Sequence, residues 1–182
     1  MSIKSLEDLF MHELRRAHAA ETSIIAQLPR LAADVGPPLQ NADVDAYLVH
    51  ARERIRTLER HFKLEGAAPA GVSSPGVAGI LAEADQLFDS IETADARSAA
   101  MRAEIQTVRS YVHSRYSALA SWARILGKTR EAECLEATLQ AGETHDSAGA
   151  PQNATFAIRA EKAPAKGISM GERLTTLFDR KS

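Results

Sequence analysis

Apolar residues recur at intervals of three and four along five stretches of the chain, which is the spacing of helices buried on one side. The first stretch runs from Leu6 to about Val35, and the second from about Asn41 to Leu64. A shorter stretch covers residues 77–91, a long one covers 98–126, and the last begins at Thr129. The pattern predicts an all-α protein in which four long helices share one core and a short helix is added.

Residues that begin or end helices stand between these stretches. Ser5 is a helix start, because its oxygen can accept a hydrogen bond from a free amide group. Gly36, followed by two prolines, ends the first helix, and Gly66 closes the second. Gly127 fits the left-handed position that ends many helices, and Thr129 can cap the helix after it. The short extra helix lies in the connection between the second and third long helices, which leaves room for a crossover.

The chain divides into a bundle and a tail. Residues 1–147 carry the helical pattern and are expected to form one four-helix bundle domain. Residues 148–182 turn to Ala, Pro, Gly, Asn and Lys, which predicts a flexible C-terminal tail. Within it, residues 170–180 have the spacing of a short amphipathic helix that could dock on the bundle or on a partner. A frayed terminus is the other interpretation.

Composition excludes several classes of partner. The 22 Lys and Arg residues nearly balance the 24 Asp and Glu residues, so we expect neither nucleic acid nor an anionic membrane surface as a partner. No segment has the roughly 20 apolar residues of a membrane span, and residues 1–10 lack the apolar core of a secretory signal. Cys134 is the only cysteine, which rules out an internal disulfide and fits a cytoplasmic location.

Several short motifs occur in an order that carries a family resemblance. The first helix contains Leu6-Glu7-Asp8-Leu9-Phe10, Ala20-Glu21 and Leu28-Pro29, and later matches include Leu58-Glu59, Gly79-Ile80-Leu81 and Leu126-Gly127. Over about residues 3–146 the chain resembles the YciE/YciF family of ferritin-like proteins. The resemblance implies a ferritin-like four-helix bundle, a link to bacterial stress responses, a homodimer, and a di-metal site bridged by carboxylates.

The sequence departs from the family where the metal ligands would lie. The family's Glu-His-Tyr-Glu run on the third helix is Arg109-Ser110-Tyr111-Val112 here, and its paired glutamates on the fourth helix are replaced by Ala141-Gly142. On the second helix the chain reads Tyr47-Leu48-Val49-His50-Ala51, although a shift of one turn would align His50 and Glu53 with the family's ligands. None of the six histidines follows a glutamate by three residues, so the Glu-x-x-His motif of di-metal bundles is absent.

Glu21 is the one acidic residue that the helical pattern directs toward the core. It shares a stripe with Ala17, Ile24 and Leu28, and a buried carboxylate without a partner is costly. Three interpretations stay open: an ion pair with an inward arginine such as Arg109, a residual metal site, or a position at the edge of the stripe in water. The candidate metal ligands are Glu21, His50 and Glu53, on a site that has largely been lost.

Two hypotheses about function follow. The first is a non-catalytic, stress-associated protein that acts by assembly or by binding an unidentified protein partner. The alternative is an enzyme, a di-iron or di-manganese ferroxidase or peroxide-handling protein. In that case irregular ligands, namely Glu21, His50, Glu53 and Glu104, would rebuild the metal centre.

Overall fold

The structure is a computed structural model that describes residues 2–33 and 38–146. Within these residues the elements are α1 (Leu6–Ala33), α2 (Pro38–Leu64), α3 (Pro75–Asp89), α4 (Ala94–Ile125) and α5 (Thr129–Asp146). The all-α prediction is confirmed. The predicted end of the first helix near Val35 and the predicted tail, including residues 170–180, lie outside the described residues.

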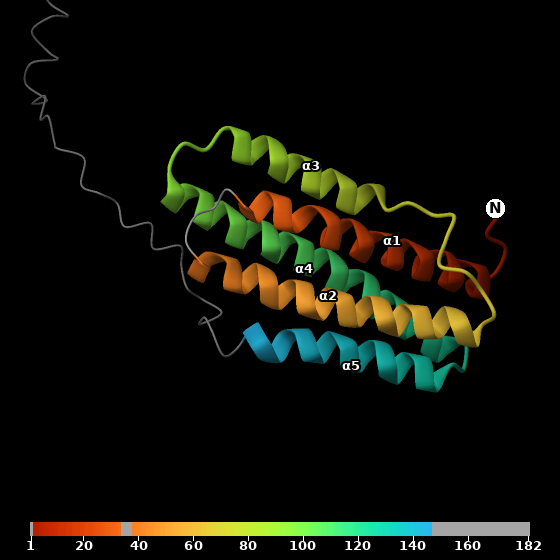
Figure 1. Ribbon diagram of the computed structural model, residues 1–182. Helices are drawn as coiled ribbons and strands as arrows, with labels where there is room; N and C mark the ends of the chain where they lie inside the picture. Colours follow the sequence, from red (N-terminus) through yellow and green to blue (C-terminus); the bar gives the residue numbers. More distant parts are fainter. Residues whose placement is uncertain (1, 34–37, 147–182) are drawn as a thin grey trace, which may run out of the picture. The chain divides into compact units, whose positions relative to one another are not determined.

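Four long helices lie side by side, and the short α3 is added on one side (Figure 1). The long helices α1, α2, α4 and α5 form the bundle, while α3 packs on α1 and α4. The connection from α2 to α4 therefore contains a whole extra helix, as the sequence pattern predicted. In this arrangement α1 and α2 face each other across the core, which positions their buried side chains to meet.

The apolar stripes predicted from the sequence form the core. Phe10, Leu14, Ile24 and Leu28 of α1 are all fully buried. The corresponding buried positions on the other helices include Tyr47, Leu58 and Phe62 of α2, Leu81 of α3, Val108, Tyr116 and Leu119 of α4, and Leu135 of α5. Cys134 is only partly buried.

Helix ends follow the predicted signals at most positions. The Ser5 hydroxyl accepts a hydrogen bond from the Asp8 amide at 3.0 Å, and Gly127 has a φ of 74°, which is the left-handed conformation. The start of α4 differs from the prediction, since the helix begins at Ala94 rather than Ser98. The cause is Thr93, whose hydroxyl caps the helix by accepting from the Ala96 amide at 3.4 Å.

No described helix is long and apolar enough to cross a lipid bilayer.

One histidine is buried where α2 approaches α5. His61 is 5% exposed, and neither of its ring nitrogens has a hydrogen-bond partner among the described residues. Burial lowers the pKa of His61, against the opposing effect of the nearby Glu131 carboxylate. The imidazole is therefore neutral in the folded protein at neutral pH, and protonating it there is unfavourable.

This histidine should make folding sensitive to mild acid. The folded pKa lies below the unfolded value of about 6.5, so the unfolded state binds the proton more readily and stability falls as the pH drops below that value. The loss is at most about 1.4 kcal/mol per pH unit. We expect the variant His61→Leu to lose less stability than the parent between neutral and mildly acidic pH, as measured by urea unfolding. Equal losses in both proteins would contradict the assignment.

Candidate functional site

A charged pair lies inside the bundle between α1 and α2. Glu21 of α1 is 0% exposed, and Arg54 of α2 is 6% exposed. Arg54 Nε donates to Glu21 Oε1 at 2.5 Å, and Arg54 Nη2 donates to Glu21 Oε2 at 3.0 Å. This two-pronged geometry is the strongest form of a carboxylate-guanidinium contact. Both carboxylate oxygens of Glu21 are thus engaged by one cation.

Burial and pairing act in opposite directions on the two charges. Burial raises the pKa of Glu21, while the Arg54 guanidinium lowers it. For Arg54, burial works against the charged form, but the Glu21 carboxylate outweighs it and the pKa is raised above its ordinary value. The arginine therefore keeps its charge, and the carboxylate is held in place by the cation opposite to it.

Two tyrosines enclose the pair. The Arg54 guanidinium lies over the Tyr47 ring on α2. The distance from Arg54 Cζ to the centroid of the Tyr47 ring is 5.0 Å. Tyr116 of α4 is fully buried, and burial together with the Glu21 charge raises its pKa. The hydroxyls of Tyr47 and Tyr116 are buried without a hydrogen-bond partner among the described residues. The Glu21 carboxylate is therefore close enough to the Tyr116 hydroxyl to raise the pKa of this tyrosine.

The arginine that pairs with Glu21 is not the one suggested from the sequence. Arg109 of α4 lies instead over the Tyr47 ring, and the distance from Arg109 Cζ to the ring centroid is 5.7 Å. The correction has a simple geometric reason, because Arg54 lies three residues after Ala51 and four before Leu58, on the buried stripe of α2. That spacing is visible in the sequence and is a signal that can identify Arg54 as an inward cation.

The other candidate metal ligands do not join Glu21. His50 and Glu53 contact each other along α2, with 3.4 Å between His50 Nδ1 and Glu53 Oε2, and the Glu53 side chain is 57% exposed. Glu104 of α4 has a raised pKa, first through burial and then through the like charge of Glu83 on α3. Among residues 2–33 and 43–140, whose side chains the structure describes, no group of three or more His, Cys, Asp or Glu side chains is arranged to hold a metal ion.

The side chains around Glu21 do not match what a di-metal centre needs. Such a centre in a bundle takes about four carboxylates and two imidazoles, which neutralise two divalent ions. Here the carboxylate of Glu21 is already neutralised by Arg54, a group that can only donate hydrogen bonds. The described residues at this point form an ion pair between tyrosines rather than a ring of acids.

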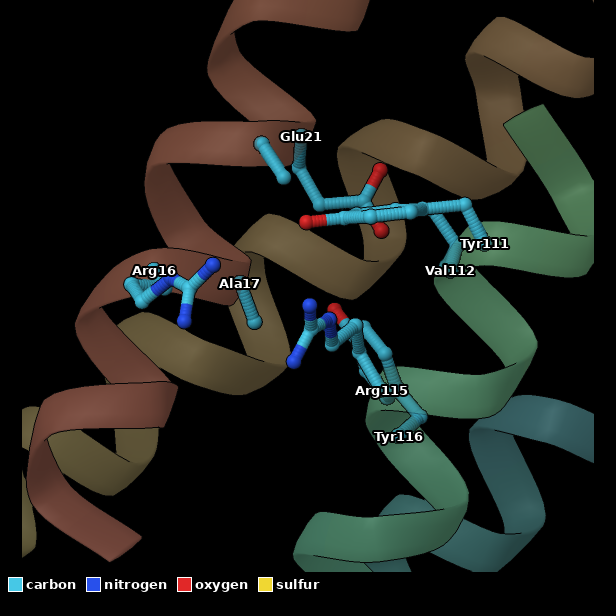
Figure 2. Close-up of a pocket in the computed structure, with 8 residues that line it drawn as sticks. Arg16, Ala17, Glu21, Tyr111, Val112, Arg115 and Tyr116 are labelled. Atoms are coloured by element: carbon cyan, nitrogen blue, oxygen red, sulfur yellow. The ribbon is translucent and has the colours of Figure 1, made fainter. Parts of the chain in front are cut away.

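A small recess lies beside Glu21. It lies between α1 and α4, and Figure 2 shows Arg16 and Arg115 at its sides with Glu21, Tyr111 and Tyr116 around it. Glu13 links the two arginines, since its Oε1 accepts from Arg16 Nη1 at 2.7 Å and its Oε2 accepts from Arg115 Nη1 at 3.3 Å. Glu13 therefore bridges the two guanidinium groups beside the recess.

Comparison with known proteins places the chain in a family. Residues 5–148 match the family model described as a domain of unknown function, DUF892. The chain belongs to this family. It is similar to Protein YciF of Escherichia coli strain K12, with 26% identity over 147 residues that cover 80% of this chain and 89% of YciF. The predicted resemblance to the YciE/YciF family is thus confirmed.

Two solved structures share the fold. YcfI from Rhodopseudomonas palustris, described as a candidate structural protein, matches with a TM-score of 0.75 and 28% identity over 81% of this chain and 94% of its own. The crystal structure of the E. coli stress protein YciF matches with a TM-score of 0.73 and 25% identity, covering 80% of this chain and 92% of that one. The ferritin-like helical fold expected from the resemblance is confirmed.

Proposed function

We propose that this chain is a non-catalytic, stress-associated member of the family, in which an internal ion pair stands in for a di-metal centre. It would act by assembly or by binding a protein partner. The observation that carries the proposal is the fully buried, two-pronged contact between Glu21 and Arg54. The role in stress is supported by the similarity to YciF, which is described as a stress protein of E. coli.

The positive charge of Arg54 would disfavour binding of a metal ion next to Glu21. A divalent cation beside Glu21 would face a buried guanidinium that keeps its charge, and like charges repel strongly in a medium of low polarity. Moving Arg54 aside would leave it buried without its carboxylate, which costs several kcal/mol. The buried ion pair would therefore oppose metal binding at this point of the bundle.

A role through assembly is supported by apolar side chains left on the surface. Leu64, the last residue of α2, is 68% exposed, and Ile125, the last residue of α4, is 72% exposed. These two helices end at the same end of the bundle (Figure 1). Two exposed aliphatic side chains at one end are compatible with a contact between two copies of the chain. We propose a homodimer, which sedimentation over a range of protein concentrations would test.

The metal content of the protein tests the central claim. We expect protein purified without chelators, and then incubated with ferrous iron or manganese, to retain well below one metal ion per chain. Its melting temperature should be the same with and without chelator, because the Arg54 cation already fills the role of the metal. Plasma mass spectrometry and a thermal melt measure these two quantities.

Variants at the pair sharpen the test. If the parent carried roughly two metal ions per chain, and Glu21→Gln removed them, the proposal would be overturned and the di-metal enzyme would take its place. Arg54→Glu adds a carboxylate at the same point and serves as a comparison. Metal uptake by that variant but not by the parent would show that Arg54 itself excludes the ions.

A further inference from the structure

The helix α5 has fewer neighbours than the other long helices. Among the helices that the structure describes, α5 packs only on α4 and α2, whereas α1 packs on α2, α3 and α4 (Figure 1). Ala132 and Leu135 of α5 are 0% exposed, so α4 and α2 supply their cover. We call the contact between α2 and α5 the α2–α5 seam. Opening this seam would expose apolar side chains while α1 stays packed on α2 and α4.

A buried imidazole lies in the α2–α5 seam. His61 of α2 is 5% exposed, and neither ring nitrogen has a hydrogen-bond partner among the described residues. The charged groups that act on this ring are Glu131 of α5, Arg60 and Glu65 of α2, and Lys128 in the turn between α4 and α5. Two anions and two cations oppose each other, and none of them is hydrogen-bonded to the ring. A proton on His61 would therefore be a buried charge without a partner, which is strongly unfavourable.

The other side of α2 responds differently to a proton. His18 of α1 also has a buried Nε2 without a hydrogen-bond partner among the described residues, but this nitrogen lies 3.7 Å from Glu59 Oε1 on α2. A proton on His18 would complete an ion pair between α1 and α2, since opposite charges at this distance attract. Mild acid therefore supports the contact of α1 with α2, whereas it acts against the α2–α5 seam.

The contact of α5 with α4 is kept in mild acid. Arg124 of α4 donates to both carboxylate oxygens of Glu136 on α5, from Nε at 2.8 Å and from Nη2 at 2.6 Å. The hydrogen bonds from Arg124 lower the pKa of Glu136, so this carboxylate stays charged when a histidine is already protonated. The turn at Gly127 joins the same two helices. Loss of the α2–α5 seam would thus leave α5 attached to α4.

We propose that protonation of His61 opens the α2–α5 seam and exposes apolar side chains of α5 such as Leu135, while the other helices stay packed. Burial lowers the pKa of His61, and opening would return the ring to water, where the pKa is about 6.5. The open form binds the proton more readily, so its population grows as the pH falls below that value, by up to about tenfold per pH unit. The proposal does not rest on the proposed function, since it concerns neither the Glu21–Arg54 pair nor metals.

Hydrogen exchange of the full-length protein, followed by mass spectrometry, tests the proposal. Exchange would be measured from about pH 7.5 to about pH 5.5, which spans the ordinary pKa of histidine. The rates would be corrected for the effect of pH on the chemistry of exchange. We expect the protection of amides in residues 129–140 to fall severalfold, because a helix that loses part of its packing frays. Amides of α1 near Leu14 and Ile24 should keep their protection.

Three variants assign the response to one imidazole. His61→Leu removes the titrating ring, and we expect the protection of residues 129–140 to become independent of pH over this range. His61→Gln also cannot take up a proton, and serves if thermal melts show that the leucine variant is not folded. His113→Leu removes an imidazole at an exposed position of α4, and should respond to pH as the parent does.

Three results would overturn the proposal. Unchanged protection of residues 129–140 in the parent would mean that the α2–α5 seam stays closed in mild acid. An equal fall of protection in α1 and α5 would mean that acid acts on the whole fold and not on this seam. The same fall in the parent and in the folded variant at position 61 would assign the response to another group.

Discussion

Replacing Arg54 with methionine is expected to lower the free energy of unfolding by about 3–5 kcal/mol, the usual cost of removing one partner from a buried ion pair. The reason is that Glu21, which is 0% exposed, would lose the only cation that contacts its oxygens among the described residues. Methionine keeps most of the volume and flexibility of the arginine stem, so little of the loss would come from a cavity. Urea unfolding followed by circular dichroism measures the change.

Matched variants show whether the effect belongs to the pair. Arg102→Met at an exposed position should change stability by no more than about 0.5 kcal/mol. The double variant Glu21→Met with Arg54→Met removes both charges, and should recover most of the loss or even exceed the parent. If Arg54→Met cost no more than Arg102→Met, the ion pair would not be the feature that organises this core.

The dependence on pH gives a second signature of the same change. Without Arg54, burial alone acts on Glu21 and the opposing effect of the guanidinium is gone, so its folded pKa should rise further. A carboxyl with a raised folded pKa binds a proton more readily in the folded state, so its contribution to stability grows as the pH falls. The difference between Arg54→Met and the parent should therefore shrink toward acid pH, and a constant difference would contradict this account.

Most of the fold could be predicted from the sequence because helix formation here is governed by local patterns. The spacing of buried residues such as Phe10, Leu14 and Leu58 indicates the helices, and glycines such as Gly127 indicate their ends. The start of α4 lies four residues before the predicted one, since Ala94 to Arg97 lack the bulky apolar residues that mark a stripe. The signal for the true start is the capping hydroxyl of Thr93.

Of the two residues in the buried pair, only Glu21 was predicted from the sequence. Its partner Arg54 was not, because that choice depends on a contact between two helices. Glu21 could be found from its own helix, because its neighbours on the stripe are buried. Its partner could not be chosen as easily, since Arg54 and Arg109 both lie beside apolar positions and long arginine side chains can also run along a surface. Which of them reaches Glu21 depends on how α1 faces α2. That packing places Arg54 against the carboxylate and Arg109 over Tyr47.

A second large effect is expected where the short helix approaches the bundle. At Gly76 of α3 an added Cβ would lie 2.8 Å from both Cε2 and the hydroxyl oxygen of Tyr111, which is closer than packed atoms allow. The ring cannot move freely, because its hydroxyl lies 3.3 Å from Ser74 Oγ and the Arg115 guanidinium stacks 5.1 Å from its centroid. Gly76→Ala should therefore destabilise the protein by about 1–3 kcal/mol, the usual cost of overpacking.

Another glycine of the same helix provides the control. Gly79 is exposed, and a Cβ there would meet nothing within 4 Å, so Gly79→Ala should stabilise the protein by about 0.5–1 kcal/mol through helix propensity alone. The opposite signs of two Gly→Ala changes three residues apart would separate packing from propensity, with urea unfolding as the measurement. Combining Gly76→Ala with Tyr111→Leu removes the ring and should abolish most of the added cost. If Gly76→Ala were as stabilising as Gly79→Ala, α3 would not be held against Tyr111 in solution.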